Sequence, residues 1–142
     1  MLRGGDILFK KVHVFRVKPG QELLGSIAHY CREHALTSGV IISIIGSVEK
    51  ARLNFLIRLP GEYESVDYPG PLEIVCAQGS VALKDDSPFI HIHIQLSGQD
   101  ICRGGHLAEA TVFSTAEVAI AELDYQLRRQ LNSYTGLNEL LD

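Results

Sequence analysis

Hydrophobic and polar residues alternate strictly between residues 89 and 97, and this pattern predicts a half-buried β-strand. The apolar positions are Ile90, Ile92, Ile94 and Leu96, and the polar positions are His91, His93, Gln95 and Ser97. Successive side chains of a strand point to opposite faces of the sheet. The isoleucine-rich face should therefore pack on the core, and the histidines should face solvent, a cleft or another subunit.

A different pattern follows Pro19-Gly20, where apolar residues recur at three-to-four spacing and predict one amphipathic helix. Its apolar positions are Leu23, Leu24, Ile27, Ala28, Cys31 and Ala35. Gly39 is a suitable stop just past the end of this pattern.

Strand patterns dominate the rest of the chain, over residues 9–17, 40–45, 51–59, 63–66, 72–83 and 101–123. The continuous apolar run 40–45 predicts a strand buried on both faces, broken or bulged at Gly46-Ser47. We expect a turn at 68–71 and an interruption near Gly79. Residues 124–142 are ambiguous, because Leu123, Leu127 and Leu131 fit a helix that Tyr134-Thr135-Gly136 would break.

Strands that follow one another through short turns are largely antiparallel, and one amphipathic helix packed on such a sheet gives an α+β fold. The 142 residues suit a single domain. We therefore predict one α+β domain over residues 1–142, with its core at about 9–137, built from a mostly antiparallel β-sheet flanked by one or two α-helices.

Charge and cysteine usage narrow the class of protein. The net charge of −4 argues against a broad basic surface for nucleic acid, and the basic residues near the start fit a solvated strand face: Arg3, Lys10, Lys11, Arg16 and Lys18. Three scattered cysteines without a CxxC pair predict free thiols in a reducing compartment. We find no secretory signal and no apolar run long enough to span a bilayer, so we expect a soluble cytoplasmic protein without a membrane partner.

The histidines carry the most specific chemistry of the sequence. His91 and His93 project from the same face of one predicted strand, and His106 lies in a segment that should pair with that strand. Three neutral imidazoles with an open fourth position are typical of an accessible zinc site. We predict that His91, His93 and His106 bind one divalent metal, with zinc as the expected ion; the alternative is an ordinary polar strand face.

Other residues are candidates to complete such a site. Gly104-Gly105 beside His106 would leave room for a bound group, and Glu109 and Glu117 are candidates to orient an imidazole. The candidates to bind a small anionic ligand are Arg52, Arg58 and Arg103. The alternative for all five charged residues, and the more common case, is an ordinary surface position, and the sequence identifies no catalytic residue.

Several motifs together resemble the plants-and-prokaryotes conserved (PPC) domain family from about residue 9 onward. They are His91-Ile92-His93, Gly104-Gly105-His106-Leu107, Thr115-Ala116-Glu117-Val118, Gly46-Ser47-Val48, Leu72-Glu73-Ile74 followed by Gly79, and Tyr134-Thr135-Gly136-Leu137. The resemblance implies an antiparallel sheet flanked by helices, a homotrimer, and a metal-binding triad at His91, His93 and His106. The family is often described as DNA-binding because plant members carry AT-hooks, but no Arg-Gly-Arg-Pro stretch occurs here, and Arg3-Gly4-Gly5 is no substitute.

Three functions remain open at this point. The first is a homotrimeric binding or regulatory module with a metal site, and the second is a metal-dependent enzyme acting on an unidentified small substrate. The third is a DNA-associated protein, for which the acidic net charge predicts weak binding at most. Because pockets often form where surfaces meet, we expect the metal in a cleft near a subunit interface.

Overall fold

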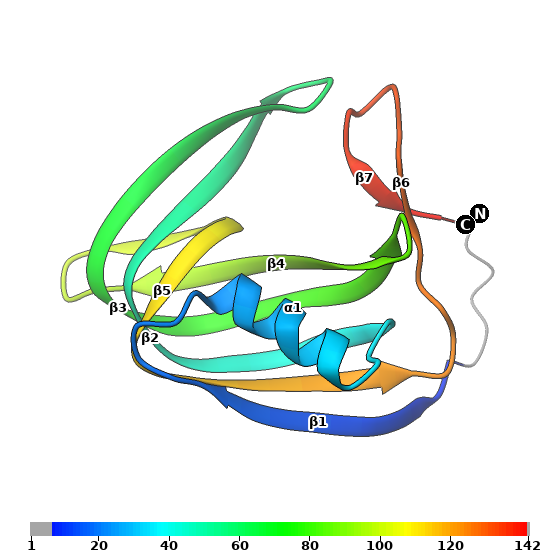
Figure 1. The fold of residues 1–142 in the computed structure, drawn as a ribbon. Coiled ribbons are helices and arrows are strands. Elements are labelled where there is room, and N and C mark those ends of the chain that lie inside the picture. Colours follow the sequence, from blue (N-terminus) through cyan, green and yellow to red (C-terminus); the bar gives the residue numbers. More distant parts are fainter. Residues whose placement is uncertain (1–6, 142) are drawn as a thin grey trace.

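The computed structural model describes residues 7–141, which form one curved sheet, a single helix and a small C-terminal hairpin (Figure 1). The sheet contains β1 (Phe9–Val17), β2 (Gly39–Arg58), β3 (Glu62–Lys84), β4 (Ser87–Ser97) and β5 (Cys102–Leu123). The helix is α1 (Leu23–Glu33), and the hairpin consists of β6 (Arg129–Leu131) and β7 (Asn138–Leu140). The expected domain bounds 1–142 and the segment Arg3-Gly4-Gly5 extend into residues outside this description.

Every strand pair of the main sheet is antiparallel, in the order β1-β5-β2-β3-β4, and β5 pairs with β4 as well as with β1 and β2. The four long strands β2, β3, β4 and β5 therefore form a closed cycle of pairings. Several register shifts between β2 and β5 mark β-bulges or other irregularities of the ladder, and bulges bend strands. The predicted α+β class is confirmed, with a single helix in the part of the chain described.

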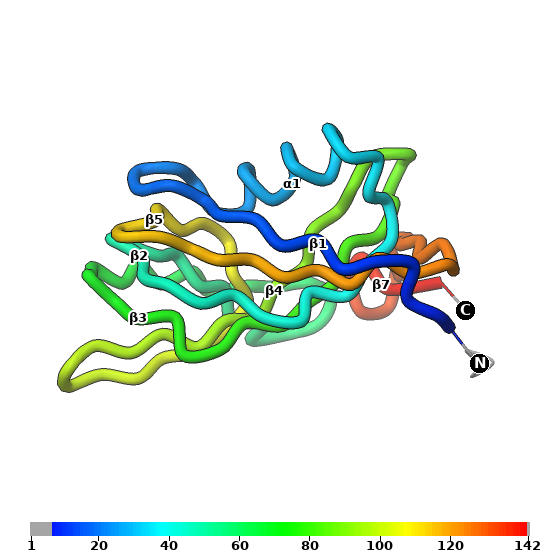
Figure 2. Tube along the Cα trace, turned by 90° about the horizontal axis from the view of Figure 1, so that it is seen from below, coloured from blue at the N-terminus to red at the C-terminus, as the bar shows by residue number. Residues whose placement is uncertain are grey.

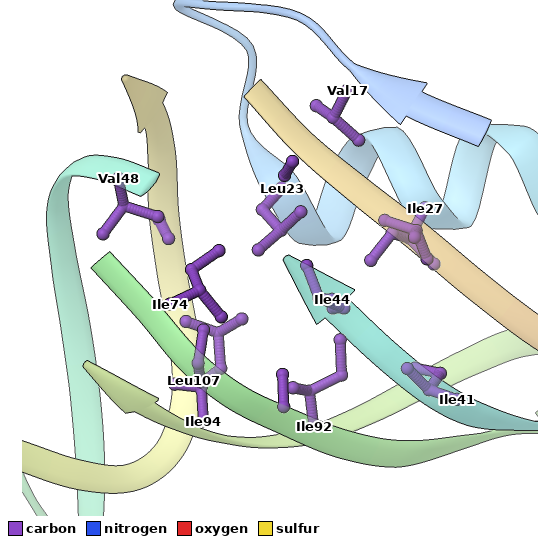
Figure 3. Packing of buried hydrophobic residues seen from close by; sticks show 14 of the residues in the cluster. Val17, Leu23, Ile27, Ile41, Ile44, Val48, Ile74, Ile92, Ile94 and Leu107 are labelled. Carbon is purple, nitrogen blue, oxygen red and sulfur yellow. The ribbon is translucent and has the colours of Figure 1, made fainter. Parts of the chain in front are cut away.

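Helix α1 lies on one face of the sheet and closes the hydrophobic core (Figures 2 and 3). Its apolar stripe, Leu23, Ile27 and Cys31, is fully buried. The side chains of Leu23 and Ile27 point toward Ile44 and Ile92 of the sheet (Figure 3). All three cysteines of the chain are free, as predicted.

The helix is shorter than its apolar pattern suggested. Glu22 caps its N-terminus by accepting hydrogen bonds from the amides of Leu24 and Gly25, and it also accepts from the amide of Ala110 on β5. At the other end, Ala35 has a positive φ of 50° and leaves the helix. Gly39 is the first residue of β2 rather than a helix stop, since α1 already ends at Glu33. Glycine suits this position because an added Cβ would lie 3.0 Å from the carbonyl oxygen of Ala121.

The prediction that residues 40–45 are buried on both faces is wrong for the single chain. Ile41 and Ile44 are each 1% exposed beneath α1, but Ile42 and Ile45 are 47% and 62% exposed. Exposed apolar side chains continue onto β1. Figure 2 shows α1 over one side of the sheet, with β1 at its edge. We call this the open apolar face, defined by Val12, Val14, Val40, Ile42 and Ile45.

Two further expectations are corrected in the second half of the chain. Residues 68–71 form no turn, and Gly79 causes no interruption, because β3 runs unbroken from Glu62 to Lys84. Pro69 pairs with Lys50 where the β2–β3 register already shifts, so its missing N–H disturbs few ladder bonds. The ambiguous C-terminal segment forms the β6–β7 hairpin and no helix over residues 124–141. No helix among the described residues has the length and apolar character needed to cross a bilayer.

Candidate metal centre

Strands β4 and β5 bring His91, His93 and His106 together on one side of the sheet. His93 and His106 are directly opposite each other in the β4–β5 ladder, and His91 precedes His93 by two residues on the same face. The ring centroids lie 5.1 Å apart for His91–His93, 4.9 Å for His91–His106 and 5.6 Å for His93–His106. The alternation and pairing expected from the sequence are therefore present in the fold.

The spacing of the imidazole nitrogens suits a single small cation. One nitrogen from each ring lies within 4.8 Å of one nitrogen from each of the others. Tetrahedral zinc with nitrogen–metal bonds of about 2.0–2.1 Å requires nitrogens roughly 3.3 Å apart. Small rotations of the three rings would close that difference, so the residues present fit a divalent metal such as zinc.

Two glycines determine how closely the backbone approaches this cluster. A Cβ added at Gly79 on β3 would lie 1.9 Å from the carbonyl oxygen of His91, so only glycine allows β3 to pass β4 there. A Cβ added at Gly105 would lie 3.0 Å from the ring of Phe55. The space beside His106 that we expected to hold a ligand is thus partly filled by Phe55.

The histidines line a cavity of about 750 Å³, which is within the usual size range of small-molecule sites. One wall is the outer part of the β2–β3 hairpin, with Phe55, Leu56 and Tyr63, and the opposite wall is the β6–β7 hairpin. Both hairpins rise from the same side of the sheet (Figure 1). They meet where the amide of Gly61 donates a 2.8 Å hydrogen bond to the carbonyl of Thr135.

The protein environment favours neutral imidazoles. Burial, followed by the nearby Arg129 charge and the other two histidines, lowers the pKa of His91 to about 4. Burial, His93 and Arg129 likewise lower the pKa of His106. Among the described residues, no protein group hydrogen-bonds to the ring nitrogens of His91, His93 or His106. At neutral pH, His91 and His106 therefore offer lone pairs to a metal without competition from protons.

Arg129 is the basic residue of this cavity, and it was not predicted from the sequence. It lies on β6, lines the histidine cavity and is partly buried. Its Nη1 donates to the carbonyl of Asn138 at 2.8 Å and its Nη2 to Ser80 Oγ at 2.9 Å, while its Nε is buried without a partner. The closing Tyr134-Thr135-Gly136-Leu137 motif was the one signal that the C-terminal segment contributes to the site.

The charged residues singled out from the sequence lie outside this cavity. Arg52 pairs with Asp67 at 2.8 Å and lies 3.7 Å from Glu109, and Arg58 pairs with Glu62. Arg103 bonds the adjacent carbonyl of Cys102, and Glu117 is exposed opposite Arg16 and Ile45. None of the five lines the histidine cavity; the acidic residue that does so is Glu139.

The fold is shared with solved structures. The Archaeoglobus fulgidus protein AF0104, described as metal-containing, superimposes with a TM-score of 0.91 at 30% identity, over 99% of this chain and 100% of that one. A PPC protein of Pyrococcus horikoshii matches with a TM-score of 0.89 at 27% identity, over 99% and 98% of the two chains. A Bacteroides thetaiotaomicron protein described as a "putative dna binding protein" shares the fold, with a TM-score of 0.85 at 22% identity over 94% and 96%.

Sequence comparison points the same way. The bifunctional protein GlmU of Synechococcus sp. (strain JA-3-3Ab) is 31% identical over 133 residues, which are 92% of this chain but only 20% of that protein. This chain thus spans about a fifth of the length of that curated relative. The profile of the Plants and Prokaryotes Conserved domain matches residues 8–124. The chain therefore belongs to the Plants and Prokaryotes Conserved domain family, abbreviated PCC or PPC.

Proposed function

We propose that this chain is a homotrimeric binding or regulatory protein in which His91, His93 and His106 hold one divalent metal ion, with zinc as the expected metal. The observation that carries the proposal is the convergence of three imidazoles, with nitrogens within 4.8 Å of one another, at the wall of a cavity. Three protein ligands leave a fourth coordination position open toward that cavity. The description of the similar Archaeoglobus protein as metal-containing supports the same assignment.

The open apolar face supports self-association, and the family resemblance implies that three subunits take part. Exposed apolar patches on a soluble protein often mark surfaces that bind another protein, here a second copy of the chain. Paired residues of neighbouring strands project to the same side of a sheet. One such row connects the open apolar face with the metal site, through Val12, Ala121, Val40, Ser80 and His91. A neighbouring subunit on this face would approach the metal, as expected from the sequence.

The proposal includes a cytoplasmic location without a membrane partner, and DNA as a weak partner at most. Structural neighbours described as DNA-binding motivate the DNA partner, but they share the fold at only 22% identity. The net charge of −4 and the missing AT-hook argue against strong binding.

A metal-dependent enzyme is the second candidate function, because the cavity holds groups that the sequence did not reveal. Glu139 and Tyr63 line the same cavity as the histidines. Glu139 Oε1 accepts a 2.7 Å hydrogen bond from Thr135 Oγ1, which fixes its position. A carboxylate in the same cavity as an open metal position is a candidate general base for hydrolysis of a small substrate.

Two measurements test the proposal. Cobalt(II) added to metal-free protein should give the intense visible absorption of a four-coordinate ion, and zinc should abolish it by competition. Light scattering should report a trimer for the native chain and smaller species for Ile45→Glu. Ile57→Glu, at a similarly exposed isoleucine of β2 outside the open apolar face, should remain trimeric. A native monomer at micromolar concentration would overturn the trimer, and the absence of a cobalt spectrum would overturn the metal site.

A further inference from the structure

Arg129 has more N–H donors than its hydrogen bonds within the protein occupy, and its positive charge lacks a nearby counter-charge among residues 7–141. A guanidinium has five N–H donors, and two are accounted for by Asn138 O and Ser80 Oγ. In the described part of the chain, no carboxylate lies within ion-pair distance of this side chain. Its aromatic neighbour Phe89 lies 5.7 Å away and supplies no counter-charge.

An unpaired cation in a partly buried position is costly, because burial removes water from the charge. The proposed divalent ion would increase the positive charge of the same cavity, since neutral imidazoles contribute none. Glu139 is the acidic residue among those lining the cavity. A negatively charged ligand would offset the positive charge that Glu139 leaves unbalanced. It would do so by binding the open metal position and the Arg129 guanidinium together.

The walls of the cavity define the rest of such a ligand. Phe55 and Leu56 from β2, Tyr63 from β3, and Leu137 and Leu140 near the C-terminus face the cavity. These side chains favour an apolar body. The planar fork of an arginine matches the two oxygens of a carboxylate better than the point charge of a lysine would.

We infer that the cavity binds a small organic carboxylate with an apolar body, whose carboxylate group lies between the three-histidine site and Arg129. The inference rests on the proposed metal site and assigns its ligand class. Arg129 is then an anion-binding residue, and the β2–β3 and β6–β7 hairpins enclose the apolar part of the ligand.

Calorimetric titration of the zinc-loaded chain of 142 residues tests this with three probes of six carbon atoms each: hexanoate, hexan-1-ol and hexyl phosphate. Hexanoate should bind about tenfold more tightly than hexan-1-ol, the effect of one charged hydrogen-bonded group. Equal affinity for the two would overturn the anion site. Tighter binding of hexyl phosphate than of hexanoate would overturn the assignment to carboxylates. These comparisons use the native chain and do not depend on the folding of a variant.

Variants then separate anion binding from a structural role of Arg129. Arg129→Gln should lose about tenfold in hexanoate affinity and keep its affinity for hexan-1-ol. Arg128→Gln is the matched control, since the neighbouring Arg128 is exposed and lies 3.6 Å from Asp86. An equal loss for both probes in Arg129→Gln would show that Arg129 only holds the cavity wall, and would overturn the inference. Partial recovery of hexanoate affinity in Arg129→Lys, which keeps the charge but not the planar fork, would support it.

The experiments can contradict the proposed metal site and the proposed anion site separately. If zinc binds and hexanoate does not, the ligand assignment fails and the proposed metal site stands. If zinc does not bind, the proposed function fails, and titration of hexanoate and hexan-1-ol into the metal-free chain still tests Arg129. Hexanoate preference that depends on Arg129 would then preserve the anion site alone, and no preference would overturn it.

Discussion

Arg129 Nη2 donates a 2.9 Å hydrogen bond to Ser80 Oγ, and through this bond the C-terminal hairpin is attached to the strand beside the histidines. Ser80 pairs directly with His91 across β3 and β4. The bond therefore places the only charged side chain of β6 at the edge of the histidine cluster. The position of the C-terminal segment and the geometry of the site are consequently coupled.

Gly79, next to Ser80, should be intolerant of substitution. In Gly79→Ala the new Cβ would lie 1.9 Å from the carbonyl oxygen of His91, so β3 and β4 must separate. We expect destabilisation by about 1–3 kcal/mol, as for other overpacked positions, together with weaker metal binding. Urea denaturation and metal titration measure the two effects.

Gly104→Ala is the matched control for this substitution, because its added Cβ would find its first neighbour at an ordinary 3.4 Å. Equal stability of Gly79→Ala and Gly104→Ala would contradict the close approach at His91.

Much of the site was predictable because it depends on local periodicity. The alternation around His91 and His93 placed both on one face, and Ile92, Ile94 and Leu96 are buried on the other. The partner histidine, His106, followed from antiparallel pairing of neighbouring strands. The first inference needs only the two-residue period of a strand, and the second also needs the pairing of neighbouring strands.

The errors concern tertiary context. An apolar run such as residues 40–45 has the same pattern whether a helix or a second subunit covers it, so its exposed face was not visible in the sequence. Arg129 is near the metal site because a hairpin far along the chain returns to β3, through the Leu83–Arg128 bridge and the Ser80 bond. Periodicity carries no information about such long-range packing.

A partly buried carboxylate–histidine pair should make stability pH-dependent away from the metal site. Glu122 Oε2 lies 2.9 Å from His13 Nε2, whose Nδ1 lies 3.1 Å from the hydroxyl of Tyr30 on α1. The bond to His13, with help from Lys10 and Lys11, lowers the pKa of Glu122 below its ordinary value of 4.5. A depressed carboxyl pKa stabilises the folded state above the unfolded pKa, and this contribution is lost as pH falls through the folded pKa.

Glu122→Gln should therefore lower the free energy of unfolding by about 1 kcal/mol at pH 7, and the difference from the native chain should shrink below about pH 4.5. Glu117→Gln, at an exposed position of the same strand, should change stability little. Chemical denaturation of the native chain, Glu122→Gln and Glu117→Gln, from pH 7 to below about pH 4.5, measures the effect. A difference that is constant with pH would contradict the ionic role of Glu122.

Any binding to DNA should be weak, independent of sequence and strongly dependent on salt. The net charge is −4, and binding through phosphate contacts depends on released counterions. The fluorescence anisotropy of a labelled duplex should show affinity falling steeply between about 50 mM and 200 mM salt. A sequence-specific footprint at physiological salt would show that this chain recognises particular base sequences, contrary to the prediction.

Elemental analysis of dialysed protein tests the three-histidine metal site most directly. The native chain should retain one zinc ion per chain, and His93→Ala should retain almost none, because two imidazoles leave the ion half-coordinated. His29→Ala is the matched control, since His29 is an exposed histidine of α1 outside the cavity, and it should keep the native content. Equal zinc content in the native chain and His93→Ala would contradict a metal site built from His91, His93 and His106.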